Sequence, residues 1–88
     1  MFEVVISNKV EKFLDKQTLK TVEKFSAISS QIAKNPFELS NIDIKRLKGE
    51  EANHFRLRIN KIRFVYKVMI KENIILFYNA GYRGDVYK

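Results

Sequence analysis

The chain has 88 residues, of which 45% are hydrophobic and 31% charged, and a formal net charge of +7. This length suits one small domain, so we expect a single domain over residues 1–88. It has no Cys and one His, which excludes a disulfide framework and a Cys- or His-rich zinc site, and we expect no metal and no cofactor. The longest apolar run, residues 74–78, is too short to span a membrane, and Met1 is not followed by a signal-peptide pattern. We therefore expect a cytoplasmic protein without a membrane partner.

The positive charge is concentrated in the C-terminal half. Residues 1–44 carry six Lys and six acidic side chains, which cancel, whereas residues 45–88 carry 11 basic and four acidic side chains. Such a distribution favours a polyanionic partner, with nucleic acid as the first candidate. The alternative is that a small Lys-rich protein is basic only for solubility.

The first 36 residues predict a strand and two helices. Residues 2–6 are rich in β-branched side chains and predict a strand. Asn8, with Glu11 three residues later, is expected to cap a short helix over residues 9–16. Thr18 can cap a second helix, which Pro36 ends. One apolar stripe is expected on this helix, formed by Leu19, Val22, Phe25, Ile28 and Ile32.

The remaining chain predicts strands. Residues 37–49 look irregular, and three strand patterns follow at 54–60, 62–70 and 73–79, with a short one at 85–87. The short connections favour antiparallel pairing of consecutive strands. The predicted fold class is α+β: an N-terminal strand, a helical hairpin, then a C-terminal, mostly antiparallel sheet in the order β-α-α-β-β-β.

Side-chain alternation predicts a basic face on this sheet. In the first of the three strands, Phe55, Leu57 and Ile59 share one face, and His54, Arg56 and Arg58 share the other. In the next strand Arg63 and Lys67 would join the same face as Arg56 and Arg58. Guanidinium groups on a rigid sheet suit a phosphate backbone. The alternative is an ordinary solvated outer face, and on this interpretation His54 is a solvated strand residue rather than a substrate contact.

The last residues add an arginine and two tyrosines beside two glycines. Glycine permits tight turns, which would bring Arg83 and Tyr87 back over the edge of the sheet. A tyrosine can stack on a nucleobase, and neighbouring cations would help its phenol to exchange a proton. Alternatively, Tyr82 and Tyr87 complete the core. No phosphate loop, dinucleotide fingerprint or nucleophile elbow is present.

Several stretches together carry a resemblance to a known family. They are Leu-Lys-Gly at 47–49, Phe-Arg-Leu-Arg-Ile at 55–59, Ile-Arg-Phe-Val-Tyr at 62–66 and Gly-Tyr-Arg-Gly-Asp-Val-Tyr at 81–87. The chain resembles the RelE/ParE superfamily of toxins over its full length. Family members of the RelE type are ribosome-dependent endoribonucleases that cut mRNA without metal, by attack of a ribose 2′-hydroxyl on the adjacent phosphate.

The resemblance implies site residues and partners. Arg56, Arg58 and Arg63 would bind phosphate and stabilise the transition state, Arg83 would lie at the scissile phosphate or leaving group, and Tyr87 would be the general base. Peripheral RNA contacts are expected at Lys45, Arg46, Lys48 and Lys61, and alternation adds Lys67. The implied partners are the ribosome, mRNA and a RelB-like antitoxin that wraps the toxin in a heterodimer or heterotetramer.

Two alternatives to an mRNA endoribonuclease stay open at the level of the sequence. A ParE-like toxin would share the fold but bind DNA gyrase without nuclease activity. A basic RNA-binding module would bind RNA without turnover.

Overall fold

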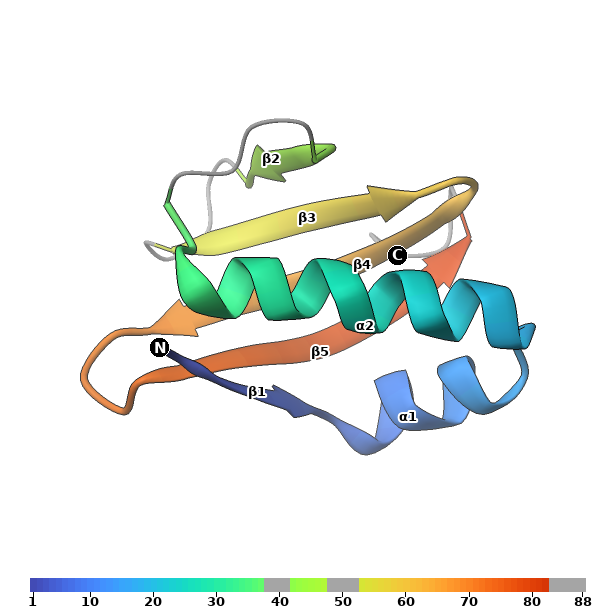
Figure 1. Cartoon of the computed structure of the whole chain (residues 1–88), viewed down its shortest axis with the longest axis horizontal. Coiled ribbons are helices and arrows are strands. Elements are labelled where there is room, and N and C mark those ends of the chain that lie inside the picture. The colour runs from blue at the N-terminus through green and yellow to red at the C-terminus, as the bar shows by residue number, and fades with distance from the viewer. Residues whose placement is uncertain (38–41, 48–52, 83–88) are drawn as a thin grey trace.

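The computed structural model describes residues 1–37, 42–47 and 53–82. Five strands form one sheet in the order β1-β5-β4-β3-β2, and both helices lie on the same face of that sheet (Figure 1). Only the β1–β5 pair is parallel, and the other three pairs are antiparallel. The predicted α+β class and its element order are confirmed.

The N-terminal strand and first helix lie close to their predicted positions. Strand β1 spans Glu3–Ile6 and helix α1 spans Asn8–Asp15. The predicted cap is wrong by one residue, because Ser7 rather than Asn8 is the N-cap and its hydroxyl accepts a hydrogen bond from the Val10 amide at 3.3 Å. Either residue type can cap a helix, so composition alone does not decide between neighbours.

Helix α2 spans Leu19–Lys34 and crosses the sheet. The Thr18 hydroxyl accepts a hydrogen bond from the Thr21 amide at 3.2 Å, which confirms the predicted cap. The helix ends before Pro36, as expected from the effect of proline on the preceding residue. The predicted apolar stripe is wrong at Leu19, which is 73% exposed because it lies in the first turn, outside the core.

The C-terminal strands form a continuous antiparallel sheet. They are β3 (His54–Ile59), β4 (Ile62–Met69) and β5 (Ile74–Tyr82). Asn60 and Asn73 adopt φ values of 54° and 61°, the left-handed conformation that asparagine tolerates in tight turns. Strand β4 ends at Met69, so Ile70 lies in the turn and is 57% exposed rather than part of the apolar face.

Two further differences concern the strands. The stretch expected to be irregular contains the short edge strand β2 (Ile44–Arg46), which pairs with β3. Strand β5 runs three residues beyond the predicted end at residue 79. The predicted strand at 85–87 lies outside the described residues.

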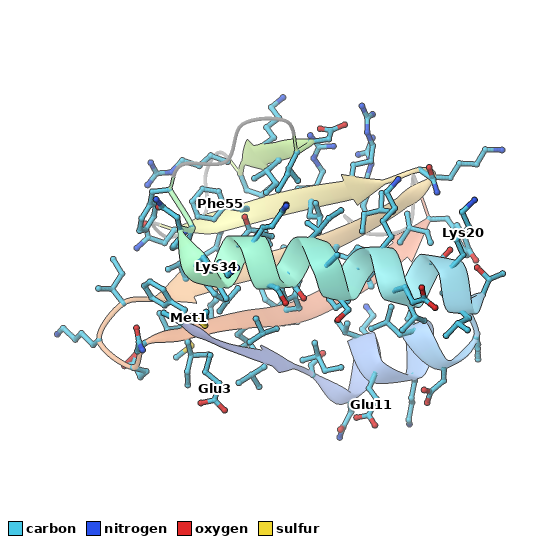
Figure 2. All side chains as sticks on the ribbon, viewed as in Figure 1. Met1, Glu3, Glu11, Lys20, Lys34 and Phe55 are labelled. Atoms are coloured by element: carbon cyan, nitrogen blue, oxygen red, sulfur yellow. The ribbon has the colours of Figure 1, made fainter. Side chains whose placement is uncertain are left out.

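The core lies between the helices and the sheet, where side chains fill the space, while Glu11 and Lys20 point outward from the helices (Figure 2). Phe64 is fully buried at its centre, with ring centroids 4.5 Å from Phe25 and 6.5 Å from Phe77. Other core residues include Val10, Leu14, Ile32, Leu57, Ile59, Ile62, Tyr66, Val68 and Ile75. The helices cover one face of the sheet and leave the other face without a helix.

Candidate nucleic-acid interface

The face of the sheet opposite α1 and α2, here called the open face, carries most of the predicted basic site. Cα pairing aligns Arg58 with Arg63, and Lys45 with Arg56. The alternation prediction is therefore confirmed as geometry: the open face contains Lys45, His54, Arg56, Arg58, Arg63 and Lys67. Cations from three adjacent strands occupy one side of a rigid sheet.

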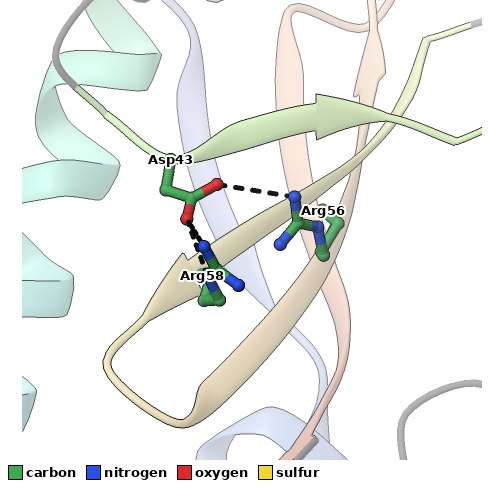
Figure 3. A network of polar contacts seen from close by, with 3 residues as sticks. All are labelled: Asp43, Arg56 and Arg58. Atoms are coloured by element: carbon green, nitrogen blue, oxygen red, sulfur yellow. Dashed lines mark hydrogen bonds and ion pairs between the residues drawn. The ribbon is translucent and has the colours of Figure 1, made fainter.

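A carboxylate connects two of these arginines (Figure 3). Asp43 lies just before β2, and its Oδ2 is 2.6 Å from both Nε and Nη2 of Arg58. Its Oδ1 is 3.4 Å from Nη2 of Arg56. The Asp43 carbonyl also accepts a hydrogen bond from the Arg58 amide at 2.9 Å. Asp43 therefore pairs closely with Arg58 and more loosely with Arg56, and it reduces the charge of the trio to +1.

Arg56 and Arg58 differ in their access to solvent. The side chain of Arg56 is 10% exposed, whereas that of Arg58 is 47% exposed. Arg58 is consequently the cation of this pair that an incoming anion can reach, while Arg56 acts from beneath it. Arg63 is half-buried on the neighbouring strand.

An aromatic pair lies on the same face. His54 Nδ1 and the Tyr78 hydroxyl are 3.0 Å apart, and the two ring centroids are 5.8 Å apart in an edge-to-face arrangement. Lys67 is the Cα partner of His54 on β4. The pair thus connects β3 with β5 across β4, beside the arginines.

The other described tyrosines do not reach the open face. Tyr66 lies in the core, stacked on Phe55, and burial raises the pKa of its phenol above the ordinary value. Tyr82 lies on the helix side, where its hydroxyl accepts a hydrogen bond from Gln17 Nε2 at 3.2 Å. It contacts Phe13 at a centroid distance of 5.5 Å but is 50% exposed, so it lies at the edge of the core and does not complete it.

The remaining predicted RNA contacts are separated in space. Arg46 lies on the helix side of the sheet, 6.0 Å from the Phe55 ring centroid, and so does not join Lys45. Arg46 lines a pocket of about 280 Å³ together with Pro36, Phe37, Ile44 and Phe55. Lys61 is exposed in the β3–β4 turn. Lys48, Arg83 and Tyr87 lie outside the described residues.

The described residues contain neither a metal-ligand cluster nor a membrane-spanning helix. Residues 1–37, 42–47 and 53–82 contain no group of three or more His, Cys, Asp or Glu side chains placed to hold a metal ion. In the same part of the chain, neither helix has the length and apolar character needed to cross a membrane.

Comparison with known proteins identifies the family. No family model matches the chain. A protein of Methanocaldococcus jannaschii named "Putative toxin RelE1" is 33% identical over 87 residues, which cover 99% of this chain and 96% of that protein. The chain belongs to the RelE toxin family. The RelE fold agrees with solved structures as well.

Two RelE structures illustrate this agreement. The archaeal RelE–RelB complex from Pyrococcus horikoshii contains a chain with a TM-score of 0.81 and 22% identity, covering 97% of this chain and 98% of that one. The intact RelBE toxin–antitoxin complex of E. coli gives a TM-score of 0.77 and 14% identity, covering 93% and 96%. These similarities confirm the RelE-like fold predicted from the sequence motifs.

Sequence reasoning missed two residues of the open face in this RelE-family chain. Asp43 falls in the stretch that looks irregular, and its proximity to Arg58 depends on β2, a strand of three residues. Tyr78 could have been assigned by alternation, since it follows the buried Phe77 in a strand. Its contact with His54, two strands away, required the sheet order.

Proposed function

We propose that the chain is the toxin of a type II toxin–antitoxin system and acts as a ribosome-dependent mRNA endoribonuclease. One observation carries this proposal: in a chain of the RelE toxin family, Arg56, Arg58 and Arg63 lie on adjacent strands of one face that the helices leave uncovered. Fixed guanidinium groups on such a face suit a phosphodiester whose negative charge increases during reaction.

The reaction is an internal transfer at phosphorus. The ribose 2′-oxygen loses its proton to a base and bonds to the adjacent phosphorus, while the bond from phosphorus to the 5′-oxygen breaks and that oxygen gains a proton. The products are a 2′,3′-cyclic phosphate and a 5′-hydroxyl. Water is not consumed, and no electrons are transferred. The cations of the open face would supply the charge stabilisation, so the proposal needs no metal ion.

The arginines divide this work by exposure. Arg58 is accessible and can donate hydrogen bonds to a non-bridging phosphate oxygen, with Arg63 as its direct neighbour across the strand pair. Arg56 is almost completely buried beside Asp43, so it would act on the phosphate mainly through the electrostatic field of its positive charge. None of them can act as a base, because a guanidinium does not deprotonate in proteins.

We assign proton transfer to residues of the C-terminal segment. Tyr87 is proposed as the base that takes the 2′-hydroxyl proton, and Arg83 as the cation at the leaving group. Tyr66 cannot take this role because its phenol is buried in the core, and Tyr82 lies on the helix side. We propose Lys45, Lys61 and Lys67 as contacts that add affinity for RNA.

We further propose that a RelB-like antitoxin binds this chain in a heterodimer or heterotetramer. The support is that both solved RelE structures described above are complexes with RelB. An antitoxin segment with acidic side chains would neutralise the open face and compete with RNA. Co-purification of this chain with the product of an adjacent gene, and loss of nuclease activity in the complex, would test the assignment.

The decisive experiment is cleavage of mRNA on programmed ribosomes. Wild-type protein is expected to cut the mRNA and to leave a 2′,3′-cyclic phosphate and a 5′-hydroxyl. Arg58→Ala and Tyr87→Phe should each reduce the single-turnover rate by about 100-fold or more. Lys20→Ala, which changes an exposed cation on α2, is the matched control and should leave the rate unchanged.

Two outcomes would overturn the proposal. One is intact mRNA together with inhibition of DNA gyrase, which would indicate a ParE-like activity. The other is RNA binding without turnover, with similar small losses from every arginine substitution, as expected of a non-catalytic module.

A further inference from the structure

We propose that His54 and Tyr78 form a binding subsite for one unpaired nucleobase, next to the phosphate held by the arginines. The inference rests on the proposed function in one respect, that the ligand of the open face is RNA. It assigns to this pair a role in positioning the substrate rather than in proton transfer.

The two rings lie outside the hydrophobic core. They are on the face that α1 and α2 do not cover, and both side chains are partly exposed. Every other described aromatic side chain of the central strands β3 and β4 packs on the helix side: Phe55, Phe64 and Tyr66. His54 and Tyr78 are thus aromatic side chains placed among cations instead of in the core.

The backbone is irregular at Tyr78. The register between β4 and β5 shifts at this point, so that Val65 pairs with Asn79 and Tyr66 pairs with Phe77. Tyr78 is the extra residue of a β-bulge. A bulge redirects a side chain at a cost in ladder hydrogen bonds, and bulges are frequent beside active sites. Here the bulge allows the Tyr78 hydroxyl to meet His54 across an intervening strand.

The pair also lies on the same strand face as the phosphate ligand. His54 and the accessible Arg58 are four residues apart on one face of β3, which separates them by about 14 Å. The stacked base would therefore belong to a neighbouring nucleotide of the strand whose phosphate binds at Arg58. Lys67, opposite His54, places a cation beside the rings. An aromatic surface flanked by cations is the usual arrangement for single-stranded nucleic acid.

The hydrogen bond between His54 and Tyr78 gives the pair an advantage over a single aromatic side chain as a binding surface. It fixes the orientation of both rings, so that stacking of a base on the pair costs little further side-chain freedom. Stacking accepts any base, since every base has a π face. The subsite would therefore increase the affinity for RNA and fix the position of the strand on the open face, with little preference for the base sequence.

The test compares two short single-stranded RNAs that carry 2′-O-methyl groups and so cannot be cleaved. One contains 2-aminopurine at a chosen position, and the other is abasic at that position. The dissociation constants are measured at low salt, and the position is moved along the strand. Wild-type protein is expected to prefer the base over the abasic site by about tenfold at one position, with quenching of 2-aminopurine fluorescence.

The variants separate stacking from other roles. His54→Ala and Tyr78→Ala should remove most of the base preference, whereas His54→Phe, which keeps a ring, should retain it. Arg58→Ala should weaken both RNAs equally, because it removes a phosphate contact. Phe37→Ala, an exposed aromatic residue at the end of α2, is the matched control and should keep the full preference. Thermal unfolding of each variant reports any purely structural effect.

Several results would overturn the inference. They are a wild-type protein without base preference, a preference that survives His54→Ala and Tyr78→Ala in folded protein, or loss of it in His54→Phe. If these variants weaken binding of the antitoxin but not of RNA, the pair belongs to the protein interface. A wild-type protein that prefers the base but does not cleave mRNA would refute the nuclease and leave the base subsite in place.

Discussion

The two faces of the sheet are made from the same strands but meet different requirements. On the helix face, alternate residues of β3, β4 and β5 are mostly buried, and aromatic rings such as Tyr66 and Phe77 contact one another. On the open face the intervening residues include cations, the His54–Tyr78 pair and apolar side chains such as Val65, and their exposure ranges from buried to exposed. Side-chain volume and packing determine which residues suit the helix face. Charge and access to a ligand determine which residues suit the open face.

This difference indicates where the stability and the activity of the protein reside. Buried apolar area stabilises the fold irrespective of sign or direction. Like charges on one face repel each other and stabilise nothing unless a counter-ion is present. Within the described part of the chain, Asp43 forms ion pairs with Arg56 and Arg58, and the open face as a whole keeps a net positive charge that an anionic ligand can complement.

The largest effect is expected from a truncation on the helix face. Phe64→Ala should lower the free energy of unfolding by about 3–5 kcal/mol, because Phe64 is fully buried between Phe25 and Phe77. Chemical denaturation would measure it. A loss below about 1 kcal/mol would mean that the core closes over the cavity and that the helix face is less tightly packed than described.

The next effect should fall on activity alone. Arg58→Ala is expected to reduce cleavage about 100-fold or more while the midpoint of thermal unfolding changes by only a few degrees, since this side chain is half-exposed. Substitutions on the open face should therefore lower activity with little effect on stability, whereas substitutions on the helix face should lower stability. Equal losses in both quantities would show that Arg58 is a structural residue.

The sequence predicts the helix face better than the open face, for a physical reason. Apolar periodicity directly reports burial, so Leu57, Phe64 and Val68 can be placed from alternation alone. The open face depends on which strands are neighbours, and this is settled by long-range pairing. The parallel insertion of β1 beside β5, the short strand β2 and the bulge at Tyr78 leave no local signal. Arg46 is an example. It follows Lys45 in β2, so its side chain lies on the helix side of the sheet while that of Lys45 lies on the open face.

A smaller and opposite effect is expected at Tyr66. Its hydroxyl is buried and has no hydrogen-bond partner among the described residues. Tyr66→Phe should therefore raise the free energy of unfolding by about 1 kcal/mol, since it removes an uncompensated polar group and keeps the ring stacked on Phe55. Cleavage should not change. A destabilised variant, measured by denaturant titration, would indicate that the phenol is satisfied, for example by a buried water.

The smallest change in stability and the sharpest test of the open face come from Asp43→Asn. The substitution keeps a hydrogen-bond acceptor for Arg58 but removes the negative charge, so the trio changes from +1 to +2. Because Asp43 and Arg58 are both nearly half-exposed, the loss of the ion pair should cost only about 0.5–1 kcal/mol. Affinity for single-stranded RNA should increase several-fold, and the slope of log affinity against log salt should steepen by about 0.7, the contribution of one more phosphate contact.

The sign of that change distinguishes two roles for the carboxylate. If Asp43 competes with phosphate for Arg58, the Asn variant binds RNA more tightly and Asp43→Ala does so too. If Asp43 instead orients the guanidinium groups, both variants bind more weakly in spite of their higher positive charge, and the weakening is greater for Ala, which can accept no hydrogen bond. The distance of 3.4 Å to Arg56, against 2.6 Å to Arg58, favours competition, since a carboxylate serving mainly to orient both side chains would be expected to approach both closely.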